Sequence, residues 1–279
     1  MKNKLRSFSI VLAAIASGAF TMTHAALTVV DNFASAAADG ALLSSVSGWS
    51  TGTVNTATVS AAAGYGGSMG ATVLANENYA LTLTGSNVLT AADGPLEFKV
   101  HFRGATSSDN YQSSTIMLTE SGGTNALAFQ FNGGTGNGNS DNYIMVSSGT
   151  GGSWGSMGLA TVANSAWEHE RWYEVTIRFE LETTGTGQSV SGFLSVLDTV
   201  TNSFLLQNVV IGGIGSGGGA FDRVDGIQIK NNGTARAFDT SNFRIGTAAV
   251  PEPATTALLV GLSVPGLVAL RRRLQRKLR

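Results

Sequence analysis

The chain has 279 residues, no cysteine, 36 glycines and a formal net charge of −1. Without cysteine it has neither a disulfide framework nor thiolate metal ligands. Only eight of the 17 basic residues lie between residues 26 and 250, with 17 of the 18 acidic ones, so this body carries about nine negative charges. Such a negative charge disfavours nucleic-acid binding. Solubility alone explains the charge, and we favour that explanation over a charged ligand.

The first 25 residues have the layout of a secretory signal peptide. Three basic residues among the first six precede a mostly apolar stretch over residues 7–20, and a short segment of small and polar residues ends at Ala25. We expect a signal helix that is cleaved after Ala25. A retained membrane anchor is the alternative, but the apolar stretch is shorter than the roughly 20 residues that a spanning helix needs.

Residues 171–181 contain the clearest strand of the body. One alternating row is apolar, namely Tyr173, Val175, Ile177, Phe179 and Leu181, and the other row is polar. Strict alternation is typical of a strand with one buried face. A turn over 183–187, a strand over 190–197, a turn over 198–202 and a strand over 204–210 then predict a meander.

Further short apolar runs between Gly- and Asn-rich turns complete an all-β pattern. Strands are predicted over 27–30, 79–83, 96–102, 114–118, 126–131, 143–146, 226–230 and 242–245. No helix longer than a turn or two is expected in the body, residues 26–249. The pattern predicts a two-sheet antiparallel sandwich of the jelly-roll type.

The order of several landmarks resembles that of concanavalin A-like jelly rolls. These are the opening segment 31–33, the Gly48-Trp49 loop, the strand region 168–181, the segment 221–227 before a late strand, and the closing segment 243–245. The resemblance implies a laminin-G- or lectin-like sandwich, a fold that commonly binds sugars or serves adhesion.

The resemblance implies a comparison with glycosidases of the same fold, which place two carboxylates on either side of the scissile bond. In that family the carboxylates belong to a Glu-x-Asp-x-x-Glu pattern on one strand. The nearest match in this sequence contains Glu168, Glu170 and Glu174. This match lacks the Asp of the family pattern, and the spacing before its last Glu is different. On one strand these acids would share a face with Trp172, whose ring could stack on a sugar. The alternative, which we favour, is the polar face of an edge or outer strand.

Oxygen-bearing turns provide the candidates for a calcium site. They are Asn137, Asn139, Asp141 and Asn142 in a Gly-rich loop, and Asp222 with Asp225 in a second turn. Gly133–Gly136 resembles the start of a calcium-binding nonapeptide repeat, but it occurs once. We favour backbone reasons for these residues and expect no metal and no cofactor. His101 and His169 are too few for a His-built zinc site.

Tryptophans provide the candidates for carbohydrate stacking. Trp49, Trp154 and Trp172, together with Trp167, could form an aromatic platform. The alternative is that they plug the ends of the sandwich, since Trp is highly buried on average.

The last 30 residues have the order of a membrane-held sorting segment. Val250, Pro251, Glu252 and Pro253 precede an uncharged run over residues 254–270, and Arg271, Arg272 and Arg273 begin a basic end. The 17-residue run spans about 25 Å as a helix, a little less than a hydrocarbon core. Basic flanks stay cytoplasmic, so the body would lie outside. A buried helix of a globular domain is the alternative.

This arrangement resembles the PEP-CTERM sorting signal of Gram-negative-type bacteria. The resemblance covers about 30 residues, 250–279, and implies recognition of Val250–Pro253 by an exosortase, with Arg271–Arg273 as the basic stop. It also implies cleavage near the motif and transfer to the cell surface or extracellular matrix. Such proteins are often linked to exopolysaccharide and biofilm production.

The sequence therefore predicts an exported surface or matrix protein of three parts, 1–25, 26–249 and 250–279. Signal peptidase, an exosortase-type enzyme and the membrane are the expected partners of the precursor, and polysaccharide is a possible partner of the body. We expect a structural or adhesive body without catalysis. A carbohydrate-binding module and a glycoside hydrolase or lyase of the jelly-roll fold are the alternatives.

Overall fold

The computed structural model describes most of the body of the chain. The described residues are 26–31, 33–36, 38–52, 54–104, 112–120, 125–133, 142–150, 160–163, 165–181, 190–214, 221–231 and 237–248. They belong to one compact unit, Ala25–Ala248. The predicted signal peptide and the segment 250–279 lie outside them. Within these ranges, no helix combines the length and apolar character needed to cross a membrane.

The larger sheet, called sheet A, is antiparallel and has nine strands among the described residues. In spatial order these are β15 (Ser203–Ile214), β14 (Val190–Asp198), β13 (Trp172–Phe179), β8 (Leu96–Gly104), β18 (Phe238–Thr247), β5 (Gly70–Val73), β4 (Thr58–Ser60) and β2 (Ala41–Leu42), while β1 (Ala26–Asp31) pairs with β18. The meander predicted over residues 171–210 is thus confirmed as β13, β14 and β15.

The second sheet, called sheet B, has seven antiparallel strands in the described part of the chain. They are β12 (Ala160–Thr161), β11 (Tyr143–Thr150), β10 (Asn125–Gly133), β9 (Gln112–Thr119), β17 (Gly226–Asn231), β6 (Asn78–Thr82) and β3 (Trp49–Thr51). A two-stranded pair of β16 (Arg223–Val224) and β7 (Leu89–Thr90), and short 3-10 turns η1 (Leu43–Ser45), η2 (Gly85–Asn87) and η3 (Ala91–Asp93), complete the described elements.

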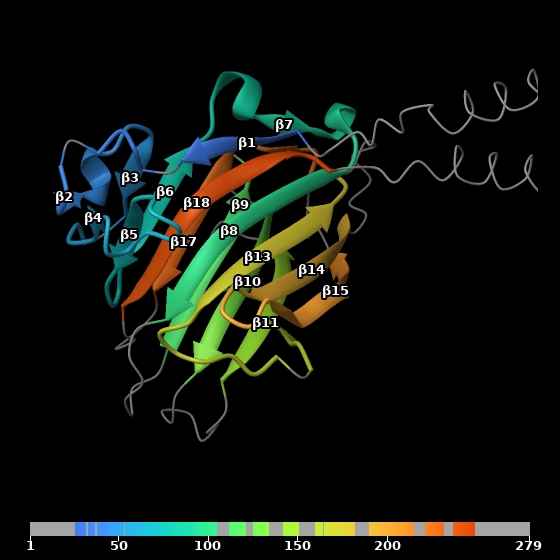
Figure 1. Ribbon diagram of the computed structural model, residues 1–279. Helices are drawn as coiled ribbons and strands as arrows, with labels where there is room; N and C mark the ends of the chain where they lie inside the picture. The colour runs from blue at the N-terminus through green and yellow to red at the C-terminus, as the bar shows by residue number, and fades with distance from the viewer. Residues whose placement is uncertain are drawn as a thin grey trace, which may run out of the picture. The chain divides into compact units, whose positions relative to one another are not determined.

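The chain crosses repeatedly between the two layers, which Figure 1 shows one behind the other. Strand β18 lies between β5 and β8 in sheet A, and its predecessor β17 lies between β6 and β9 in sheet B. The successive pairs β5–β6, β8–β9 and β17–β18 therefore wrap around the same core side by side. This is the antiparallel jelly-roll sandwich that the sequence predicts.

Aromatic side chains from both sheets form the core between the layers. Phe102 of β8 stacks on Phe131 of β10 with ring centroids 3.8 Å apart, and Trp167 meets both rings edge-on. The apolar row predicted in residues 171–181 faces this core, and Tyr173 and Val175 are almost fully buried. Since successive strand residues alternate between faces, the other row of each strand points out of the sandwich.

One buried carboxylate ties the irregular segment before β4 to the β5–β6 turn. Glu77 is fully buried. Its side chain accepts hydrogen bonds from the Thr56 amide (2.8 Å) and hydroxyl (2.5 Å), the Leu74 amide (2.7 Å) and the Tyr79 hydroxyl (3.1 Å). A buried polar group needs such partners, so Glu77 links the segment before β4 to the β5–β6 turn through hydrogen bonds.

We expect Glu77→Gln to destabilise the protein by about 1–3 kcal/mol, because an amide NH₂ would replace one acceptor and face a backbone N–H donor. The measurement is the free energy of unfolding in urea. Glu168→Gln is the control, since the Glu168 side chain is 66% exposed and surface changes usually stay within about 0.5 kcal/mol. Equal effects of the two substitutions would contradict the assignment.

Candidate functional site

The outer face of sheet B presents amides and hydroxyls. Gln130 and Asn132 of β10 and Ser113 and Thr115 of β9 point away from the core, and each is at most 5% exposed. The Gln130 side-chain nitrogen donates to Ser113 Oγ (2.7 Å) and Thr115 Oγ1 (2.8 Å), and Asn132 donates to Gln130 Oε1 (3.3 Å). These bonds hold the amide groups in fixed orientations.

Strand pairing continues this polar surface across five strands. Met145, Gln130, Thr115, Lys230 and Asn78 are direct cross-strand partners on β11, β10, β9, β17 and β6. Interstrand steps of about 4.8 Å give this row a length of about 19 Å. We call it the amide row. Its central side chains, Gln130 and Thr115, are buried, and its flanking ones are half-buried.

The flank of the amide row offers two hydrogen-bonding atoms that no described residue contacts through a hydrogen bond. Asn78 Oδ1 and Gln228 Oε1 are buried and have no hydrogen-bond partner among the described residues. Gln228 lies two residues before Lys230 on β17 and points to the same side. Burial lowers the pKa of Lys230. Buried acceptors without partners are uncommon in folded proteins, and they point to a polar ligand or to water.

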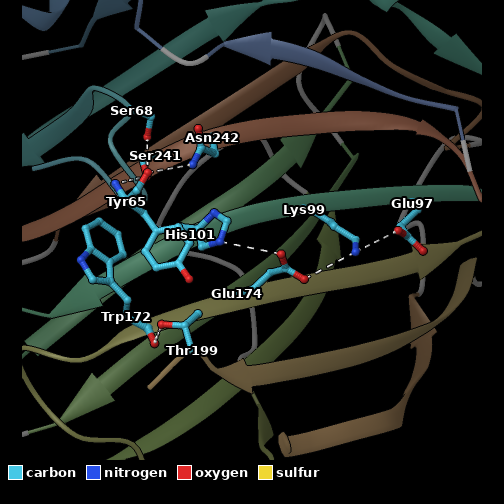
Figure 2. Close-up of polar contacts among 10 residues, drawn as sticks. All are labelled: Tyr65, Ser68, Glu97, Lys99, His101, Trp172, Glu174, Thr199, Ser241 and Asn242. Atoms are coloured by element: carbon cyan, nitrogen blue, oxygen red, sulfur yellow. Dashed lines mark hydrogen bonds and ion pairs between the residues drawn. The ribbon is translucent and has the colours of Figure 1, made fainter. Parts of the chain in front are cut away.

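The outer face of sheet A is different, because charged side chains of β8 and β13 pair with one another. On β8 and β13, Glu97 contacts Arg178 at 2.5 Å, and Lys99 lies 3.5 Å from Glu97 and 3.4 Å from Glu174. Figure 2 shows Lys99 between the two glutamates. The network holds β8 and β13 in register from the outside, so its first role is structural.

His101 lies in this network beneath an aromatic ring. Its imidazole stacks on Tyr65 with centroids 4.1 Å apart, and its Nε2 is 3.7 Å from Glu174 Oε2 (Figure 2). Burial lowers the pKa of His101 to about 4; the negative charge of Glu174 opposes this shift, and the positive charges of Arg244 and Lys99 add smaller contributions in the same direction as burial. The ring is therefore neutral at neutral pH.

Trp172 extends the aromatic cluster on sheet A. Its ring lies 5.6 Å from that of Tyr65, and the Arg103 guanidinium lies 4.7 Å from its centre. Arg103 also contacts Asp239 at 2.6 Å. Trp172 is half-buried, so part of its side chain remains at the surface, as a stacking residue requires.

The carboxylate candidates do not form one strand face. Glu174 belongs to β13, but the strand begins only at Trp172, and Glu168 and Glu170 precede it in a turn where Glu170 has a φ of 59°. The expectation that all three share a face with Trp172 is wrong, because the left-handed residue interrupts the alternation. The expectation of an edge or outer strand is also wrong, since β8 and β14 flank β13.

The other tryptophans occupy the interior or lie outside the described residues. Trp49 is 5% exposed, packs against Phe33 and Phe243, and donates from its indole nitrogen to Asp31. Trp167 is likewise buried between the sheets. Both act as plugs of the sandwich, so Trp49 offers no open ring for stacking. Trp154 lies outside the described residues.

The calcium candidates are only partly described. Asn137, Asn139 and Asp141 lie outside the described residues. The Asn142 amide donates to the Trp167 carbonyl at 2.7 Å. Asp225 contacts Arg223 at 3.2 Å, and Asp222 is exposed. In the described part of the chain no three His, Cys, Asp or Glu side chains gather into a group that could hold a metal ion.

The sequence matches no protein-family model and no curated protein. Among solved structures, the chain resembles a marine PL-14 alginate lyase from Aplysia kurodai (8% identity, TM-score 0.45, 68% of this chain and 87% of that one). It also resembles the exoplasmic/lumenal domain of VIP36 in a form bound to Ca²⁺ and Man3GlcNAc, with 10% identity and a TM-score of 0.45. That match covers 77% of this chain and 90% of the VIP36 chain. A third similar structure is the CBM2 module of the evolved Dit of Lactobacillus casei BL23 phage J-1, with 13% identity and a TM-score of 0.39. That match covers 62% of this chain and 70% of the module's chain. The fold assignment itself rests on the strand order above.

We expect an acid-dependent loss of stability centred on His101. The unfolded chain binds a proton to this ring near pH 6.5 and the folded protein only at about 4. The stability is therefore complete above about pH 6.5 and falls as the pH drops towards 4, by about 3 kcal/mol in all. Urea unfolding of the wild type and His101→Gln across this range should show a shallower loss in the variant. Parallel pH profiles would contradict this.

Proposed function

We propose that this protein is an exported surface or extracellular-matrix protein whose β-sandwich binds polysaccharide, without catalysis, through the amide row of sheet B. The observation that supports this most strongly is the row of side chains across five paired strands, in which Gln130 and Asn78 are amides and Thr115 is a hydroxyl. Each amide side chain both donates and accepts hydrogen bonds, as sugar hydroxyls do. A row of about 19 Å matches an extended chain better than a single small molecule.

The chemistry of the two outer faces favours binding over hydrolysis. Glycoside hydrolysis uses two carboxyl groups on either side of the scissile bond. The amide row is neutral apart from Lys230 among its described residues. On sheet A, Glu97 and Glu174 are engaged with Arg178 and Lys99. Their carboxylates therefore have structural partners.

A second candidate face for sugar is the aromatic pair of Tyr65 and Trp172 on sheet A. The half-buried indole favours this alternative, because a ring at the surface can stack on a pyranose. Arg103 already lies near this ring, which is why we place the main site on sheet B.

Export and processing belong to the same proposal and follow from the ends of the sequence. The signal peptide would be removed after Ala25, and residues 254–270 would hold the precursor in the membrane with its basic end in the cytoplasm. An exosortase-type enzyme would then cleave near Val250–Pro253 and hand the body to the surface or the matrix.

For the binding function, we expect Gln228→Ala to weaken retention on polysaccharide by about three- to tenfold in affinity electrophoresis, since one or two hydrogen bonds are lost. The substitution should leave folding unchanged because Gln228 Oε1 has no hydrogen-bond partner in the described part of the chain. Trp172→Ala is the comparison. Loss with Trp172→Ala alone would move the site to sheet A, and no retention on any polysaccharide would contradict binding.

For the processing, mass spectrometry of the exported protein should show an N-terminus at Ala26 and a new C-terminus near Pro251. Replacing Pro251, Glu252 and Pro253 together by alanine should leave the precursor in the membrane fraction. An exported protein that still ends at Arg279 would contradict the proposal.

A further inference from the structure

Several apolar side chains that stay exposed gather at one side of sheet A. They belong to β14, β15 and the turn between them, where β15 is the last described strand of the sheet (Figure 1). The exposed fractions are 48% for Phe193, 71% for Val200, 51% for Phe204 and 64% for Val210. We call these four residues the edge patch. An exposed apolar group of this kind often marks a contact with a partner.

Strand pairing brings the edge patch together on the outer face of the sheet. Phe193 of β14 is the direct cross-strand partner of Val210 of β15, and Leu197 is the partner of Phe204. The even-numbered residues of β14 between them are buried in the core, so Phe193 and Leu197 point outward. The two apolar pairs lie four residues apart along β14, a distance of about 13 Å.

The polar side chains inside the edge patch already bond to each other. Ser195 lies between the two apolar pairs on β14. The Asn208 amide of β15 donates to Ser195 Oγ at 2.9 Å, and Ser195 Oγ donates to Asn208 Oδ1 at 3.4 Å. No charged residue occurs in the sequence between Asp198 and Asp222. The surface is therefore uncharged along β15, and covering it costs little in lost hydration of polar groups.

From these features we infer that the edge patch docks against the same patch of a second copy of this chain, so that the protein forms a two-fold symmetric dimer. In such an isologous contact one surface serves both partners. The exposed phenylalanines of each copy would be covered by apolar side chains of the other. The inference goes beyond the proposed function, because it concerns self-association and does not depend on sugar binding.

The chemistry of the edge patch favours a second copy over other partners. A polysaccharide needs hydrogen bonds for its hydroxyls, and the four apolar side chains offer none. A membrane surface attracts proteins through basic side chains, which are absent between Asp198 and Asp222. Two bodies that each hold 17 acids and eight bases between residues 26 and 250 repel each other, so an uncharged side is where they can meet.

The contact is expected through side chains rather than through backbone pairing. The outermost strand of a sheet can add a strand from another chain. The pairing of β15 with β14, however, has three register shifts. Such bulges bend a strand and are one of the devices that protect sheet edges. The outer face of β14 and β15 therefore has to supply the contact.

The size of the edge patch predicts a weak dimer. An aromatic side chain buries about 150–250 Å², so the half-exposed Phe193 and Phe204 together offer roughly that area. With the two valines, the patch offers about 300–400 Å², as the largest apolar patch of a protein commonly does. Two patches and their polar rim would bury about 1,000 Å², at the lower limit for specific interfaces. We expect a dissociation constant in the micromolar range.

The test measures the mass of the protein, purified from the cells that produce it, by sedimentation equilibrium. We expect the mass to rise from one chain towards two between about 1 and about 300 μM. Val210→Lys should weaken dimerisation by about tenfold or more, because it puts two like charges into an apolar contact. Val29→Lys is the matched control, since Val29 is an exposed valine of β1, outside the edge patch.

A second variant removes apolar area without adding a charge. Phe193→Ser should also weaken dimerisation by about tenfold, since a large exposed apolar side chain is lost from the contact. Phe193 and Val210 are about half exposed or more, so both variants should fold as the wild type does. Thermal unfolding at a concentration where the protein is monomeric checks this.

Each outcome decides. The mass of one chain at every concentration overturns the dimer, and sugar binding is then tested separately by retention on polysaccharide. Dimerisation that Val29→Lys weakens as much as Val210→Lys and Phe193→Ser do overturns the assignment to the edge patch. A protein that stays monomeric but binds vesicles of anionic phospholipid, with the binding lost in Phe193→Ser, overturns the second copy as the partner.

Discussion

The burial of one alternating row from every long strand is the constraint on which this structure depends. Phe102 and Phe131 meet between the layers, and the inner rows of both sheets gather around them. A register slip of one residue would exchange inner and outer rows, and on β8 it would bury Lys99 and Arg103. The outer rows are thereby placed as firmly as the core, although they do not contribute to it.

Because the outer rows are fixed in this way, the two faces can differ in chemistry without changing the fold. On sheet A, acids and bases from neighbouring strands pair across β8 and β13 and hold a neutral His101 beneath Tyr65. On sheet B, amides bond to hydroxyls and leave some acceptors unused. For this reason we propose a structural role for the first face and a recognition role for the second.

Local alternation was enough to find the long strands, and most of the predicted ones are confirmed with extended ends. It failed where strands have only two to four residues, as in β2 to β5, because so short a segment shows no period. It also failed at Glu170, whose left-handed backbone ends the pattern before β13 begins. Glu77 gave no sign of its role, since its partners come from Thr56, Leu74 and Tyr79.

The sequence by itself determined the all-β class, the apolar row of Tyr173 to Phe179 and the acidic character of the body. Those properties depend on near neighbours or on composition. Only the tertiary structure decided that Gln130, Thr115 and Lys230 form one row, because the jelly-roll crossing brings β17 beside β9 from over 100 residues away. Strand order depends on how whole layers pack around the core, and no local pattern of residues encodes it.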